Sequence, residues 1–228
     1  MVLDDMCCSI EDGDCSVWAK EMLEITNRGE RVLEIGCGSG ETSLVLAIQG
    51  RMSTALDYSH KSIDLVEKAA NRLNCKVDAV FADATKDLPF SKQYFDVIFQ
   101  AGLLEHFDSE HRVRLLKNWK RYGKKMISLI PNAHSVAYRY GKYLQEKNGT
   151  WEYGLEIPQS SLKDDFRAAG IRVIEEYTIG ENHALAFLPE DHFVRKALEE
   201  VYNLNNDHIR DWWQGYLLVT IGECYNGN

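Results

Sequence analysis

Two hydrophobic spacings alternate along residues 30–130 of the chain. Short apolar runs, several rich in β-branched residues, predict strands at 31–35, 52–57, 77–82, 95–100 and 125–130. Between them, apolar residues recur at helical spacing and predict helices at 41–49, 59–73 and 109–122. Strands separated by helices of this length indicate right-handed βαβ units. The pattern therefore predicts an α/β fold, in which a doubly wound parallel sheet is covered by helices on both faces.

The flanking segments depart from this alternation. A polar leader at 1–13, expected to be loose, precedes a helix at 14–27 with Asp14 as its N-cap. The second half predicts a helix at 159–169, a strand at 171–179, a helix near 190–202 and a last strand at 216–222. Segments 131–158 and 180–215 are long for connections in a compact domain, which usually makes such segments functional. Their aromatic residues include Tyr138, Tyr140, Tyr143, Trp151, Tyr153, Trp212 and Trp213, for which packing is favoured over lining a ligand.

Composition and charge exclude several classes of protein. The 228 residues suit one domain, 1–228, and a hydrophobic content of 45% argues against disorder along the chain. With 26 basic and 35 acidic residues, the net charge of −9 argues against a nucleic-acid partner, because phosphate contact needs a basic footprint. The N-terminus lacks the basic and apolar regions of a signal peptide, and no apolar run approaches the ~20 residues that span a bilayer. A cytoplasmic protein without a membrane partner is expected.

The six cysteines are scattered and include no C-x-x-C pair, so a disulfide framework is not indicated. Cys7, Cys8 and Cys15 cluster in the acidic leader. A metal or thiol site there is less favoured than reduced thiols in a mobile segment, because zinc ligands usually show tighter paired spacing. No metal site is predicted.

The candidate chemistry begins at a glycine-rich turn between a predicted strand and a predicted helix. Gly36, Gly38 and Gly40 let the backbone turn tightly and approach a ligand, and the helix start offers free N–H groups. Asp57 ends the next strand, where a carboxylate can accept hydrogen bonds from ribose hydroxyls. Glu41 stands where the dinucleotide fingerprint has its third glycine, and a carboxylate there would repel a pyrophosphate. A nucleoside without phosphates is therefore favoured.

The run E-I-G-C-G-S-G resembles the first motif of class I S-adenosylmethionine-dependent methyltransferases, and the order of later motifs agrees. The resemblance, to the small-molecule branch of the family, implies S-adenosylmethionine as cofactor and a seven-stranded sheet with an antiparallel last strand. It implies cofactor-binding roles for Glu34, Gly36, Cys37, Gly38, Gly40, Asp57, Tyr58, Asp83, Ala84, Gln100 and Gly102. Residues 30–130 would then form the cofactor-binding half, 1–29 a leader and helix, and 131–158 and 180–215 insertions on the acceptor side.

Alternatives stay open at several of these positions. Glu34 either contacts the cofactor's ammonium group or orients the glycine loop by hydrogen bonds. Asp57 could instead cap the helix that follows, Asp83 could be a surface acid, and Cys37 occupies a variable position of the motif.

The expected reaction is methyl transfer to an O, N or C atom of a small-molecule acceptor. An acceptor hydroxyl or ammonium must lose a proton, so His106 and His134, after the fourth and fifth strands, are the candidate catalytic residues. A histidine at either place could also only brace its loop. The competing readings are a non-catalytic or regulatory protein of the same fold, and a methyltransferase acting on a carrier protein or glycan.

Overall fold

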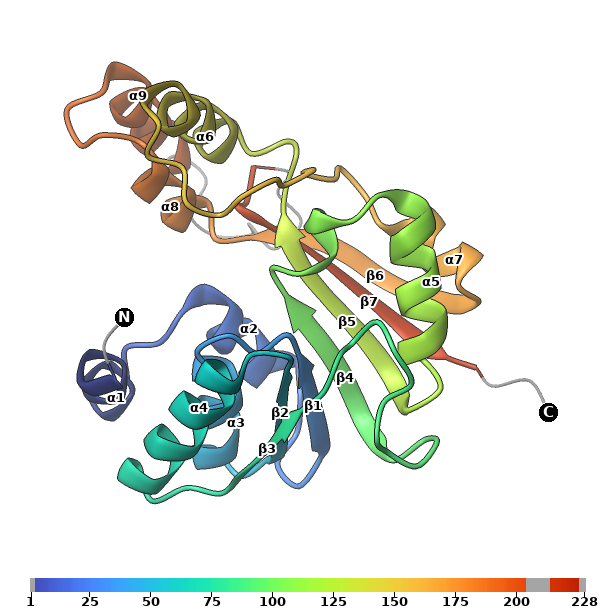
Figure 1. Cartoon of the computed structure of the whole chain (residues 1–228). Coiled ribbons are helices and arrows are strands. Elements are labelled where there is room, and N and C mark those ends of the chain that lie inside the picture. The colour runs from blue at the N-terminus through green and yellow to red at the C-terminus, as the bar shows by residue number, and fades with distance from the viewer. Residues whose placement is uncertain (1–2, 204–213, 226–228) are drawn as a thin grey trace.

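A seven-stranded sheet forms the centre of the computed structural model, which describes residues 3–203 and 214–225 (Figure 1). The strands lie in the order β3-β2-β1-β4-β5-β7-β6. They span Arg31–Ile35 (β1), Met52–Asp57 (β2), Val77–Phe81 (β3), Phe95–Ala101 (β4), Gly123–Pro131 (β5), Ile171–Ile179 (β6) and Leu217–Cys224 (β7). Strands β1 to β5 pair in parallel, whereas β7 runs antiparallel to both β5 and β6. The expected α/β fold, with its antiparallel last strand, is confirmed.

Helices cover both faces of this sheet. One face carries α2 (Val17–Ile25), α3 (Glu41–Ile48) and α4 (His60–Arg72), and the other carries α5 (Ser109–Trp119) and α7 (Lys163–Ala168). Met22 and Leu46 are fully buried in the first layer, and Trp119 and Phe166 are fully buried in the second. Alternate residues of the central strands face each layer, which explains why both faces of these strands carry mostly apolar residues.

The N-terminal leader is helical rather than loose. Helix α1 (Leu3–Glu11) buries Met6 and Cys7 against Leu44 of α3 and against α4. The prediction of a loose leader is therefore wrong, because apolar residues at 3, 6, 7 and 10 form one helical stripe despite the acidic residues between them. Asp14 is not the N-cap of the next helix. Ser16 is, since its Oγ accepts a hydrogen bond from the backbone N–H of Ala19.

A group of short helices lies beyond the carboxyl ends of β4 and β5 and is here called the cap, residues 132–160 and 180–203 (Figure 1). It consists of α6 (Val136–Asn148), α8 (Glu181–Ala184), the 3-10 helix η2 (Leu185–Phe187) and α9 (Phe193–Asn203). Ala137, Leu185 and Tyr202 form its own small core. The predicted Trp212-Trp213 pair lies outside the described residues.

Candidate cofactor and acceptor site

The glycine turn is held in a conformation that side chains would disturb. Gly36, Gly38 and Gly40 have φ values of +71°, +54° and +73°, the left-handed region that favours glycine. A Cβ on Gly40 would lie 2.3 Å from Cγ2 of Val66 in α4, and one on Gly36 would lie 3.1 Å from the side chain of Leu103. The turn therefore packs closely against α4 at Gly40 and against the loop after β4 at Gly36, whereas Gly38 is required by its backbone conformation alone.

Asp57 is tied to the glycine turn. Its Oδ2 accepts a hydrogen bond from the backbone N–H of Gly38 at 3.0 Å, and its Oδ1 accepts one from the N–H of Ser59 at 2.8 Å. The residue is 7% exposed and lines a cavity. Because an ionised carboxylate has about four acceptor positions, both oxygens can still accept a ligand hydroxyl. The side chain that caps α4 is Ser59, whose Oγ accepts from the N–H of Ser62.

Glu34 is directed at the start of α3. Its Oε2 accepts hydrogen bonds from the N–H and the Oγ of Ser43, at 3.1 and 2.6 Å. Burial raises the pKa of this carboxyl to about 7, although the two bonds from Ser43 act in the opposite direction. These contacts favour the loop-orienting role of Glu34 over a direct contact with the cofactor.

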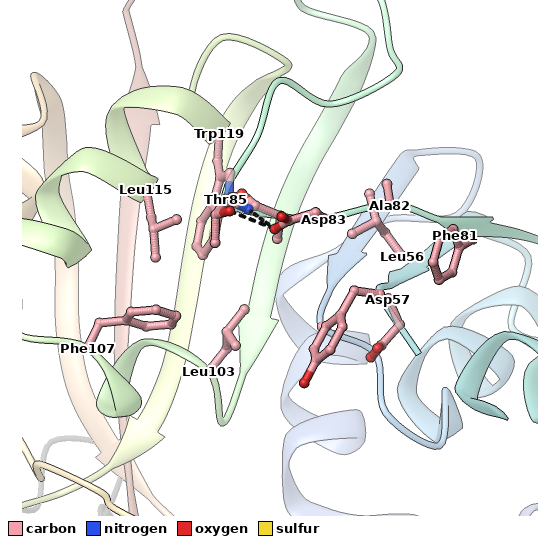
Figure 2. Close-up of a pocket in the computed structure, with 13 residues that line it drawn as sticks. Leu56, Asp57, Phe81, Ala82, Asp83, Thr85, Leu103, Phe107, Leu115 and Trp119 are labelled. Carbon is pink, nitrogen blue, oxygen red and sulfur yellow. Dashed lines mark hydrogen bonds between the residues drawn. The ribbon is translucent and has the colours of Figure 1, made fainter. Parts of the chain in front are cut away.

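A cavity of about 650 Å³ opens beside Asp57 (Figure 2). Phe107, Leu115 and Trp119 line one side, and Leu56, Asp57 and Phe81 lie on the other. The predicted residues Gly36, Asp57, Tyr58, Asp83 and Ala84 all contribute to its lining. An apolar wall opposite a carboxylate suits a nucleoside, whose base is aromatic and whose ribose carries hydroxyls.

The loop at the far end of this cavity is held by side-chain contacts. Asp83 accepts hydrogen bonds from the N–H and Oγ1 of Thr85, which lower the pKa of the Asp83 carboxyl (Figure 2). The indole N–H of Trp119 donates to the carbonyl oxygen of Ala84 at 2.8 Å. Asp83 is itself exposed, so its bonds orient the loop while leaving its other oxygen accessible.

A second cavity, of about 330 Å³, lies on the other side of the glycine turn, and Gly36 lines both. Predicted residues in its lining are Glu34, Gly36, Cys37, Gly38, Gly102 and His106. The lining also includes Trp18, Glu105, Tyr153, Glu156 and Tyr216, of which only Tyr153 was considered from the sequence as a residue that could line a ligand. The last four come from the loop after β4, from the cap and from the approach to β7, so they meet only in the folded chain.

Gln100 and His134 lie apart from both cavities. Gln100 is fully buried beneath the loop after β4, where its Oε1 accepts hydrogen bonds from the N–H groups of Leu103 and Leu104. His134 is exposed at the start of the cap. Gly40 also lines neither cavity, and acts through the packing of the turn against Val66.

His106 stands at the boundary between the loop and the cap. Its Nδ1 lies 2.7 Å from the carbonyl oxygen of Leu155. A carbonyl can only accept, so Nδ1 carries the proton in the neutral ring and Nε2 keeps a free lone pair. In the same two segments, the N–H of Ile157 donates to the carbonyl oxygen of Glu105 at 2.8 Å. The cap is thereby joined to the loop after β4.

Metal ligands do not gather at this site. Over residues 3–203 and 214–225, no three His, Cys, Asp or Glu side chains form a group that could hold a metal ion. Cys7 is buried in the α1 contact, and Cys8 is exposed. In the same part of the chain, no helix is both long and apolar enough to cross a bilayer.

Comparison with known proteins agrees with this geometry. Residues 32–125 match the family described as "Methyltransferase domain". The chain is 32% identical over 165 residues to "Ubiquinone biosynthesis O-methyltransferase" of Coxiella burnetii, an alignment that covers 67% of this chain and 68% of that protein.

Two solved structures show the likeness of fold. Magnesium protoporphyrin IX methyltransferase from Synechocystis PCC 6803, with bound SAH, has a TM-score of 0.60 at 14% identity, over 91% of this chain and 80% of the other. The (4+2)-cyclase SpnF has a TM-score of 0.61 at 18% identity, over 92% and 81%. Since one of the two is a cyclase, the fold alone does not define the reaction.

The family match and the curated relative together do define the class. The chain belongs to the class I S-adenosylmethionine-dependent methyltransferases, and S-adenosylmethionine is its methyl donor. The residues present fit this cofactor: Asp57 offers acceptor positions for ribose, the first cavity has an apolar wall for adenine, and the turn at Gly36 leads into the second cavity.

Proposed function

We propose that the protein transfers a methyl group to an oxygen atom of a small-molecule acceptor held in the second cavity. The observation that carries the proposal is that the two cavities meet at Gly36, so one can take the nucleoside while the other takes the acceptor. The curated relative is an O-methyltransferase by name, which favours oxygen over nitrogen or carbon. A cavity of about 330 Å³ suits a small molecule better than a protein or glycan chain.

Bound S-adenosylmethionine would supply an activated methyl group on a sulfonium, and the chain supplies position and exclusion of water. Asp57 and the lining at Asp83 and Ala84 would hold the adenosine part. Gly38, Gly102 and Cys37 would surround the methionine part, with Glu34 holding the turn through Ser43. Tyr58 is 77% exposed and would cover the ribose from the solvent side.

Both predicted catalytic histidines stay proposals, and His106 is better supported than His134. His106 lines the second cavity and keeps Nε2 free, so it can take a proton from an acceptor. His134 is exposed and lines neither cavity, so it is the weaker candidate.

Calorimetric titration with S-adenosylmethionine and its demethylated product tests the cofactor part. The acceptor part is tested by incubating the protein with methyl-labelled S-adenosylmethionine and a cell extract separated into a small-molecule filtrate and a macromolecular fraction. We expect label in the filtrate, in a product whose labelled methyl group is bound to oxygen as a methyl ether. Label confined to the macromolecular fraction would instead support the carrier-protein or glycan reading. Cofactor binding with label in neither fraction would support the non-catalytic reading.

A further inference from the structure

The second cavity is lined by a glutamate with a buried carboxyl oxygen that has no partner among the residues the structure describes. Glu105, in the 3-10 helix η1 (Leu104–His106), is 2% exposed and lines this cavity. Among the described residues, no hydrogen-bond donor reaches its Oε2, although a bond from its own backbone N–H reaches the carboxyl. Nearly all buried polar groups in native structures have a partner, so this oxygen calls for a donor from outside the chain.

The neighbouring carboxyl group is already satisfied. The side chain of Glu156 is 6% exposed, and its Oε2 accepts a hydrogen bond from the hydroxyl of Tyr138 at 2.5 Å. Lys142 Nζ lies 3.7 Å from the same oxygen and also 3.7 Å from the centre of the Trp151 ring. Glu156 therefore has partners within the cap, in Tyr138 and in Lys142, which Glu156 shares with Glu146. Oε2 of Glu105, a residue of the same cavity lining, has no partner in the described part of the chain.

We propose that Glu105 binds the hydroxyl of the acceptor through Oε2 and receives its proton during methyl transfer. This inference rests on the proposed function and assigns the residue that acts as general base in the methyl transfer. As the acceptor's O–H bond breaks, the proton passes to Oε2, and the oxygen's electron pair forms the bond to the methyl carbon. The carbon–sulfur bond breaks with its electron pair on sulfur, so a methyl ether, a neutral thioether and a protonated Glu105 result.

Glu105 and His106 are adjacent candidates for the same proton, and their surroundings distinguish them. His106 is exposed, and its ring is engaged in joining the loop to the cap through Leu155. Glu105 is enclosed, so a bond to its oxygen forms without competition from water. Burial, with a further contribution from Glu156, raises the pKa of Glu105 to about 8, close to the value that suits proton transfer near neutral pH.

The pH dependence has a definite sign. Only the ionised carboxylate can accept a proton, so kcat/KM for the acceptor should rise with pH and level off above the pKa of Glu105. Other titratable or charged groups face this carboxyl or line the same cavity, namely Glu34, Cys37, Glu41, His106, Tyr138, Tyr153, Glu156, Tyr216 and, next to Glu156, Lys142. Assigning the rise of kcat/KM with pH to Glu105 therefore requires a variant in which this residue is replaced.

The test compares Glu105→Gln with Glu110→Gln, the same change at an exposed position of α5. Titration with S-adenosylhomocysteine should give the wild-type affinity in both variants, which shows that each is folded. Transfer of labelled methyl to the small-molecule filtrate should fall about 100-fold or more in kcat for Glu105→Gln, with the rising pH limb lost. Glu105→Asp should recover part of the rate.

A second measurement does not depend on the acceptor. In protein labelled with ¹³C at the glutamate carboxyls, one resonance should titrate near pH 8, and it should be missing from Glu105→Gln. A rate within about threefold of wild type and an unchanged pH limb in Glu105→Gln would overturn the assignment, as would loss of that limb in His106→Gln alone. If the wild-type protein transfers no label to the filtrate, the proposed function itself is wrong. If the wild type transfers label and Glu105→Gln keeps its rate and pH limb, only the role of Glu105 is wrong.

Discussion

The cofactor side and the cap are built in different ways. Around the glycine turn, the deciding contacts join consecutive strand, turn and helix segments, as Glu34 with Ser43 and Gly38 with Asp57. These contacts involve backbone N–H groups, so the conformation of the backbone itself positions the binding groups of the site. In the cap, the contacts are between side chains, such as Tyr138 with Glu156 and Tyr138 with Tyr216. The cofactor side therefore tolerates little change, whereas the acceptor side can change its lining without altering the turn.

The largest effect expected from this difference is on stability. Gly40→Ala places a Cβ 2.3 Å from Val66 at a φ of +73°, whereas Gly149→Ala at the end of α6 meets nothing within 4 Å at a φ of +69°. Left-handed backbone costs an alanine about 1–2 kcal/mol in either place, and overpacking adds about 1–3 kcal/mol at Gly40 alone. Denaturant unfolding should show the larger loss for Gly40→Ala, with partial recovery in Gly40→Ala/Val66→Ala. Equal losses would contradict the close packing of the turn.

The same difference explains what the sequence could and could not predict. The strands and the βα turns carry local signals, so the sheet and the strand–turn–helix around Gly36 were predicted correctly, and Asp57 ends β2 as predicted. The cofactor-binding role of Asp57 stays a prediction. Glu105 and Glu156 have no such signal, because they come together only when the cap folds onto the loop. Helix α1 was missed although Leu3, Met6, Cys7 and Ile10 carry a helical stripe, since the acidic composition hid it.

Gln100 shows a further limit of sequence patterns. A polar residue at the end of a buried strand can point toward a ligand or support the loop beside it, and the spacing is the same in both cases. Here the side chain is fully buried and bonded to Leu103, Leu104 and Ser128. Its proposed part in cofactor binding would therefore act through the loop.

Within the cofactor side, Asp57 should contribute more than Asp83 to the affinity for the cofactor. Asp57→Ala removes a buried carboxylate that holds Gly38 and Ser59 and offers positions to ribose, so the affinity for S-adenosylhomocysteine should fall about 100-fold. Asp83→Ala removes an exposed acid already bonded to Thr85, and a fall of no more than about fivefold is expected. Calorimetric titration measures both. Normal binding by Asp57→Ala would exclude its ribose role, and equal losses would mean that the adenine loop contributes as much as the turn.

The smallest effect should come from the cap. Tyr138→Phe keeps the ring contacts with Tyr216 and Phe187 but removes the hydroxyl that donates to Glu156. Leaving that carboxylate one donor short costs about 1–2 kcal/mol, part of it recovered by Lys142. Because Glu156 lines the second cavity and not the first, the KM for the acceptor should rise severalfold while the affinity for S-adenosylhomocysteine stays at its wild-type value. A matching loss of cofactor affinity would show that the cap and the glycine turn respond as one unit, and the separation between the two regions would then be wrong.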